Sequence, residues 1–119
     1  NFPRNGLIAL PDNVFDHLVS LQKLNLRINN LIALPDNVFD DTMSLQDLDL
    51  EDNKLTTLPL GVFDGLSALV NVTLSDNDLV LEAGNFRGAS AVEVLHLYGN
   101  DMGTLQSGVF VGLVSLRQL

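Results

Sequence analysis

The sequence predicts an α/β-class parallel solenoid, a coil in which each turn of the chain adds one short strand to a single sheet. Two independent columns of residues predict this fold. Asparagines recur with spacings of 24, 24, 24 and 23 residues, at Asn5, Asn29, Asn53, Asn77 and Asn100. Five of the six phenylalanines keep the same step, at Phe15, Phe39, Phe63, Phe86 and Phe110. A period of this length is typical of arrays of stacked repeats.

Each repeat carries one apolar pattern, which is clearest in Leu45 to Ala68, LQDLDLEDNKLTTLPLGVFDGLSA. Apolar residues occupy positions 1, 4, 6, 11, 14, 19 and 22, with Asn at 9 and Pro at 15. The third full repeat is one residue short, between Leu79 and Leu81. We therefore predict one array over residues 1–119, with partial repeats 1–20 and 116–119 around the full repeats 21–44, 45–68, 69–91 and 92–115.

The pattern assigns a place to each kind of side chain. Positions 4 and 6 point inward along a short strand, so positions 3, 5 and 7 point outward. The asparagine lies where the chain leaves the strand, and its amide can satisfy buried turn backbone between repeats. The phenylalanines should stack in the core. Pro11, Pro35 and Pro59 prevent a long helix from starting at position 15, so the convex side should be mostly irregular, with single helical turns at most.

The motif LxxLxLxxNxL followed by LPxxxFxxL resembles the 24-residue "typical" leucine-rich repeat over essentially all 119 residues. Stretches such as LTTLPLGVFDGL and LIALPDNVFD are most similar to variable lymphocyte receptors, and toll-like receptors and matrix proteoglycans use related repeats. This resemblance implies a right-handed, horseshoe-shaped solenoid with its strands on the concave face, and a role in recognising proteins. Glu82 and Gln106 replace the proline, and Thr42 and Ala89 replace the leucine at position 22.

Composition narrows the classes of partner. The chain has fifteen acidic and six basic residues, a net charge of −9, and no cysteine. Such a surface repels phosphate backbones and anionic lipids, so we expect neither nucleic acid nor membrane contact by this segment. No apolar run approaches the ~20 residues that cross a bilayer. Without cysteine, disulfides, thiol catalysis and cysteine-based zinc sites are excluded from these residues.

We expect no catalytic, cofactor or metal site. His17 and His96 are far apart in sequence, and a smooth sheet face supplies neither a nucleophile nor a water-excluding pocket. Acidic residues crowd two adjacent repeats but lack a calcium-binding spacing, so a solvated or partner-binding acidic face is the better interpretation. The GxxxG pairs recur with the repeat and are interpreted as turn glycines. A glycan on the sequon Asn71-Val72-Thr73 would obstruct the proposed binding face, which favours a chance occurrence.

The outward positions of the strands vary while the apolar pattern repeats, as expected of a binding face on a constant scaffold. We predict that a partner contacts this face through charged, polar and aromatic side chains. The residues are Lys23, Asn25, Arg27, Asp47, Asp49, Glu51, Asn71, Thr73, Ser75, Glu93, His96 and Tyr98. Register should also pair Lys23 with Asp47 and Arg27 with Glu51 across neighbouring strands.

The sequence therefore predicts a non-enzymatic module that binds an unidentified protein through its concave face. Two alternatives stay open: an adhesion or matrix component, and the repeat region of a larger signalling protein or enzyme. The resemblance implies an extracellular or cell-surface location, with the cytoplasm as the alternative. Neither end carries a polar cap over Phe2 or the core leucines, so we expect a segment of a longer array.

Overall fold

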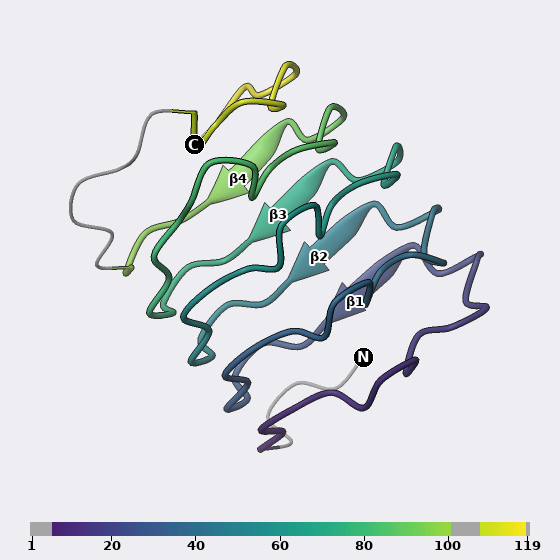
Figure 1. The fold of residues 1–119 in the computed structure, drawn as a ribbon, viewed down its shortest axis with the longest axis vertical. Coiled ribbons are helices and arrows are strands. Elements are labelled where there is room, and N and C mark those ends of the chain that lie inside the picture. Colours follow the sequence, from purple (N-terminus) through teal and green to yellow (C-terminus); the bar gives the residue numbers. More distant parts are fainter. Residues whose placement is uncertain (1–5, 101–107, 119) are drawn as a thin grey trace.

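Four strands of three residues each form one parallel sheet in a computed structural model that describes residues 6–100 and 108–118. The strands are β1 (Lys23–Asn25), β2 (Asp47–Asp49), β3 (Asn71–Thr73) and β4 (Val94–His96). They lie in sequence order, β1-β2-β3-β4, each one turn of the coil from the next (Figure 1). A further bridge joins Val94 to Gln118. The predicted solenoid with its parallel sheet is confirmed.

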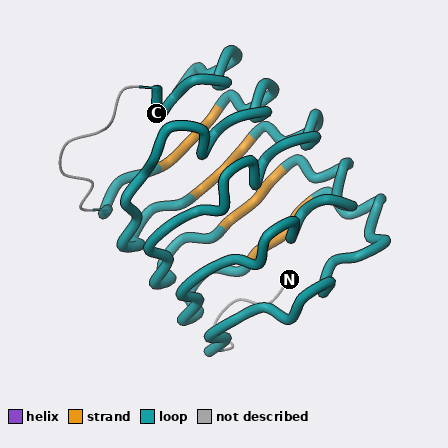
Figure 2. Tube along the Cα trace, in the orientation of Figure 1, coloured by secondary structure: helices purple, strands orange, loops and turns teal. Residues whose placement is uncertain are grey.

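The strands pair in the register that the repeat alignment predicts. Leu24 lies opposite Leu48, and Leu48 lies opposite Val72, so the apolar residue of each strand faces the interior. Outside the strands, the described chain consists of turns and irregular segments, and none of it is helical (Figure 2). No helix in the described ranges could therefore cross a membrane.

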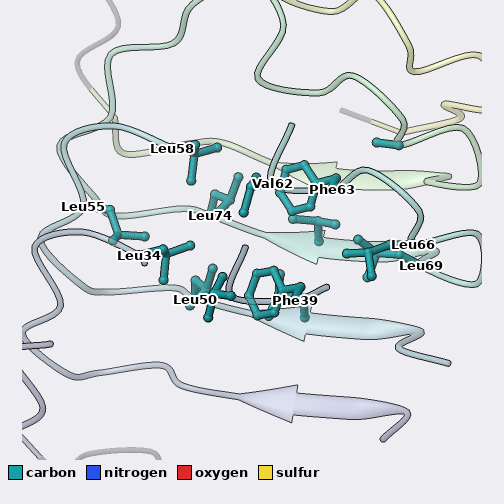
Figure 3. Packing of buried hydrophobic residues seen from close by; sticks show 14 of the residues in the cluster. Leu34, Phe39, Leu50, Leu55, Leu58, Val62, Phe63, Leu66, Leu69 and Leu74 are labelled. Carbon is teal, nitrogen blue, oxygen red and sulfur yellow. The ribbon is translucent and has the colours of Figure 1, made fainter. Parts of the chain in front are cut away.

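The core is one continuous column of apolar side chains inside the coil. Phe63 and Phe86 stack with ring centroids 5.8 Å apart and planes 1° from parallel, and Phe86 and Phe110 stack at 6.0 Å. Leucines from the strands and the returning segments pack against the rings (Figure 3). Leu18 departs from the pattern: 44% of its surface is exposed, although Phe15 in the same turn is buried. The predicted phenylalanine stack is confirmed for these pairs and for Phe15 with Phe39, whose ring centroids lie 6.3 Å apart, but Phe39 does not stack on Phe63.

The asparagine column ties each turn to the preceding one. Asn53 accepts a hydrogen bond from the Leu31 amide at 3.1 Å and donates to the carbonyls of Leu26 and Leu50, each at 3.0 Å. Asn77 repeats this arrangement one turn further on. Buried polar groups of the turn are thereby satisfied by side chains, as the sequence predicts. Asn5, the first of the predicted column, lies outside the described residues, as does Gln106.

Left-handed backbone conformations recur in the turns opposite the strands. The GxxxG glycines are turn glycines, as predicted: Gly61 and Gly65 have φ angles of 72° and 79°. In the earlier repeats Asn13 and Asn37 occupy the place of Gly61 with similar angles. Glycine and asparagine adopt this conformation at the least cost.

The short repeat replaces a proline and a valine by two residues that bond to each other. Glu82 stands where Pro59 stands one turn earlier, and Asn85 stands where Val62 stands. Proline has no amide hydrogen, whereas the amide of Glu82 donates to Asn85 Oδ1 at 2.6 Å. The buried Asn85 amide also donates to the Leu58 carbonyl of the preceding turn at 3.1 Å. The new donor at position 15 thus receives an acceptor from position 18.

Candidate functional site on the strand face

The outward surface of β1–β4 and of the residues just after each strand, here called the strand face, carries the residues predicted to bind a partner. Parallel register aligns them in columns. Position 3 contributes Lys23, Asp47 and Asn71, and position 5 contributes Asn25, Asp49, Thr73 and His96. Position 7, two residues further along, contributes Arg27, Glu51, Ser75 and Tyr98. Glu93 lies one residue before β4, so Val94 takes the place beside Asn71.

A shallow hollow of ≈ 280 Å³ lies over the first three strands. Leu24 and Leu48, whose side chains face the interior, lie beneath it, and the other lining residues are polar. The wall residues are Lys23, Asn25, Asp47, Asp49, Asn71 and Thr73. All six belong to the predicted binding set, so register has gathered residues that are 24 positions apart in sequence around one concavity.

Some polar side chains of this face also support the fold. Asn25 Oδ1 accepts the amide of Arg27 at 3.1 Å, and Asp49 Oδ1 accepts the amide of Glu51 at 3.0 Å. These bonds cap the chain where it leaves the strand. Asn71 Nδ2 donates to the carboxylate of Asp47 across the strands. The side chain of the sequon asparagine is therefore already engaged with its neighbour.

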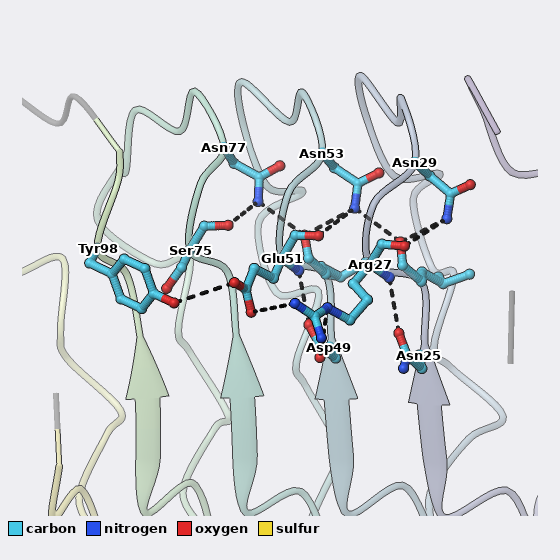
Figure 4. Close-up of polar contacts among 11 residues, drawn as sticks. Asn25, Arg27, Asn29, Asp49, Glu51, Asn53, Ser75, Asn77 and Tyr98 are labelled. Carbon is cyan, nitrogen blue, oxygen red and sulfur yellow. Dashed lines mark hydrogen bonds and ion pairs between the residues drawn. The ribbon is translucent and has the colours of Figure 1, made fainter. Parts of the chain in front are cut away.

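A chain of polar contacts crosses four turns along the position-7 column (Figure 4). The Tyr98 hydroxyl donates to Glu51 Oε1 at 3.3 Å, and Glu51 Oε2 lies 3.6 Å from Arg27 Nη2. Arg27 Nε lies 3.9 Å from Asp49 Oδ2. The expected pairing of Arg27 with Glu51 is confirmed. The negative charge of Glu51, more than burial, raises the pKa of Tyr98, and the charge of Asp76 adds to the effect.

The prediction that Ser75 is exposed on the binding face is wrong, because none of its surface is accessible to solvent. Its short side chain lies between Glu51 and Tyr98, the position-7 residues of the flanking turns. The hydrogen bond between those two longer side chains passes over the serine and covers it. Ser75 Oγ is buried without a hydrogen-bond partner. The position of the serine in the repeat predicts that its side chain points outward, but it does not show that longer side chains on either side cover it.

The face offers few groups for chemistry. His96 and Tyr98 meet edge to face with ring centroids 6.5 Å apart. Among the described residues, no group of three or more His, Cys, Asp or Glu side chains is arranged to hold a metal ion. His17 lies away from the strand face, where its amide donates to Asp41 Oδ2 at 2.8 Å.

Sequence reasoning missed a feature at the edge of the strand face. Position 8 adopts a left-handed backbone in all four turns, at Ile28, Asp52, Asp76 and Gly99. Aspartate and glycine tolerate this conformation, but a β-branched residue is strained in it. Ile28, with φ 56°, is the exception in the column. The repeats aligned with one another could have indicated this turn, because three of the four residues at position 8 are aspartate or glycine, which favour turns.

Stacked turns, a parallel sheet, an asparagine column and an aromatic stack define a repeat scaffold, and the sequence comparison agrees. The sequence profile of the family described as "Leucine rich repeat" matches residues 19–79, about half of the chain. The chain belongs to this family. No curated protein sequence matches it significantly.

Among solved structures, the fold is similar to the crystal structure of the APL1 leucine-rich repeat domain. The TM-score is 0.78 and the sequences are 28% identical. The match covers 87% of this chain but only 27% of that one. The chain therefore spans about a quarter of the length of this relative.

Proposed function

We propose that the chain is a non-enzymatic module that binds a protein partner through the strand face, the side expected to be concave. The observation that carries the proposal is the hollow over β1–β3, whose walls are formed by six of the twelve residues selected from the sequence. Leucine-rich repeat domains commonly serve protein–protein interaction, and this coarser role comes with the family.

The character of the face supports a polar, charge-selective interface. The proposed set contains two basic and four acidic residues, and its chain carries a net charge of −9. Arg27 pairs with Asp49 and Glu51, but one arginine does not neutralise these two acids together with Asp47. The face is therefore acidic at β2, and Lys23 is its other basic residue. A partner that presents cationic groups opposite β2 would be steered to this face by its field.

The test compares arginine substitutions on and off the strand face in the full chain. Asp47→Arg and Asn71→Arg place bulk and positive charge at the hollow, and Asp36→Arg and Asp40→Arg add at least as much positive charge on exposed turns elsewhere. We expect the strand-face variants to lose at least about tenfold in affinity for a partner identified by co-purification, as for interface centres generally. The controls should stay within about twofold.

Circular dichroism of each variant distinguishes lost contacts from lost folding. If Asp36→Arg and Asp40→Arg abolish binding while Asp47→Arg and Asn71→Arg leave it intact, the partner uses the turn side and the proposal is wrong. Loss of binding in all four folded variants would indicate a response to net charge and would equally contradict a localised interface.

An assembly role is a second candidate, because three of the four described residues in one exposed column are apolar. Ile8, Ile32 and Val80 follow position-11 leucines and are each more than half exposed, and Thr56 stands between Ile32 and Val80. Backbone bonds join these places from turn to turn, including Ile32 N to Ile8 O at 3.3 Å. Sedimentation of Ile32→Ser beside the unmodified chain tests this role: a shift to a smaller species would favour self-association.

We also propose an extracellular or cell-surface location, since the repeats resemble those of extracellular recognition proteins. Fractionation of the producing cells with the full-length protein tests this. Recovery only from the cytosol would contradict it.

A further inference from the structure

A polar cluster at the far end of the strand face combines charge, an aromatic surface and an unsatisfied hydroxyl. Tyr98 is 61% exposed, so most of its ring is open to solvent. The carboxylate of Glu51 lies at its hydroxyl. Asp76 approaches from the edge of the face: a side chain at Gly99 would collide with the Asp76 carboxylate, so this acid is folded over Gly99, next to the tyrosine.

Ser75 supplies the independent indication of a ligand. Its Oγ is fully buried between Glu51 and Tyr98 and lies beside the tyrosine hydroxyl, close enough to offset part of the rise that Glu51 causes in the pKa of Tyr98, yet it makes no hydrogen bond of good geometry. An unsatisfied buried hydroxyl costs stability and is rare in native proteins. The bond that covers it, from Tyr98 to Glu51, is long at 3.3 Å and joins exposed groups. A stronger donor could therefore displace the phenol from the carboxylate and reach the serine.

The left-handed backbone at position 8 favours a short polar residue, but an uncharged asparagine would suit it as well as an aspartate. Asp52 and Asp76 are adjacent, exposed and alike in charge, and such pairs repel. Arg27 compensates Glu51 from the opposite side, but no ion pair compensates Asp76 among the described residues. The tyrosine end of the face thus has negative charge on two sides of an aromatic ring.

We propose that Glu51, Ser75, Asp76 and Tyr98 form a subsite for one cationic side chain, lysine or arginine, of the protein partner. The cation lies against the exposed face of the Tyr98 ring and bonds to Glu51 and Asp76, with Ser75 Oγ as a further acceptor. Cation–aromatic attraction and charge-assisted hydrogen bonds both act at such a position. The proposal rests on the strand face being the binding surface and names the partner's chemistry at one point of it.

The test uses small cations, so it does not require the partner. The ¹⁵N-labelled full chain is titrated with N-acetyl-lysine methylamide and N-acetyl-arginine methylamide, with N-acetyl-norleucine methylamide as the neutral control. We expect saturable amide shifts confined to Ser75, Asp76 and Tyr98 with the cations, and none with norleucine. Asp76→Asn should weaken the affinity roughly three- to tenfold, whereas Asp64→Asn, outside the strand face, should not change it.

Two variants separate the subsite from a merely structural role. Tyr98→Phe keeps the ring and removes the competing hydroxyl, so it should bind the cations at least as tightly, while Tyr98→Leu should lose them. Ser75→Ala should weaken cation binding about two- to threefold without lowering the urea midpoint, because the hydroxyl it removes is unpaired.

Non-saturating shifts, shifts spread over all acidic surfaces, or equal effects of Asp64→Asn and Asp76→Asn would overturn the subsite. This failure is distinguishable from failure of the proposed function. If Asp47→Arg and Asn71→Arg abolish partner binding but Asp76→Asn and Tyr98→Leu do not, the face binds a partner and this subsite is wrong.

Discussion

The exchange of Pro and Val for Glu82 and Asn85 gives the sharpest test of how the repeat adapts to a change in its pattern. Asn85→Val restores the residue found at position 18 one turn earlier, yet we expect it to destabilise the chain. It leaves the Glu82 amide and the Leu58 carbonyl without the partners that lie 2.6 and 3.1 Å away. The bond to Leu58 is buried and the bond from the exposed Glu82 is only partly buried. An orphaned buried group costs roughly 1–3 kcal/mol and the apolar valine recovers part of the loss, so we expect a net loss of about 2 kcal/mol.

The second substitution should reverse that loss. Glu82→Pro removes the amide hydrogen that Asn85 accepts, and proline fits the backbone at this position in three earlier repeats. Alone it should cost about 1 kcal/mol, the value of one hydrogen bond, less a small gain from restricting the unfolded chain. The double variant should come within about 1 kcal/mol of the unmodified chain, which corresponds to a coupling free energy of about 2–3 kcal/mol between the two sites.

Urea denaturation followed by circular dichroism measures the free energy of unfolding of the four species, with equal slopes as the condition for comparison. The matched control is Glu82→Ala combined with Asn85→Val, which makes a similar change in side chain but keeps the amide hydrogen. The control should stay as unstable as Asn85→Val alone. If it is as stable as the proline double variant, rescue does not come from removing the donor and the reasoning is refuted.

Three other predictions, with four variants, concern the position-8 column, the core and the strand face. Ile28→Asn should stabilise the chain by about 0.5–1 kcal/mol, because asparagine tolerates the left-handed backbone that strains isoleucine; a lowered urea midpoint would contradict this. Phe63→Ala should cost ~3–5 kcal/mol and Phe110→Ala clearly less, since Phe110 is only partly buried; equal losses in thermal melts would argue against a graded stack. Glu51→Gln should lower the pKa of Tyr98 by removing the charge that raises it, which absorbance near 295 nm reports for the sole tyrosine of a chain without tryptophan; an unchanged titration would exclude that cause.

The fold could be predicted because its determinants are periodic. Leu48 and Asn53 each belong to a column whose members repeat the same side chain at the same step, so one environment accounts for all of them. Parallel register then follows from the repeat, and Lys23 comes to lie opposite Asp47 as expected. A solenoid suits this reasoning because each turn contacts mainly its neighbours.

The remaining features of the fold and the site could not be predicted because they depend on contacts between particular residues that the repeat pattern does not specify. Outward orientation was predicted for Ser75 from its position alone, but exposure depends on how far the side chains on either side of it reach. Asn85 looks like an isolated departure from valine until the amide of Glu82 is considered. In both cases the decisive partner lies at a place where the sequence pattern constrains neither residue.

The contacts within the strand face also set a condition on any partner. Tyr98, Glu51 and Arg27 already bond to one another, so a partner that binds any of them must replace an existing contact. Arg27 and Glu51 are partly exposed, and ion pairs near the surface contribute only about 0–1 kcal/mol, so a partner with matching charge replaces them at little cost. For an apolar partner it would leave Glu51 and Arg27 desolvated, which costs considerably more than the pair contributes. The network therefore discriminates between partners: it admits a polar, cationic surface at this end of the face and disfavours an apolar one.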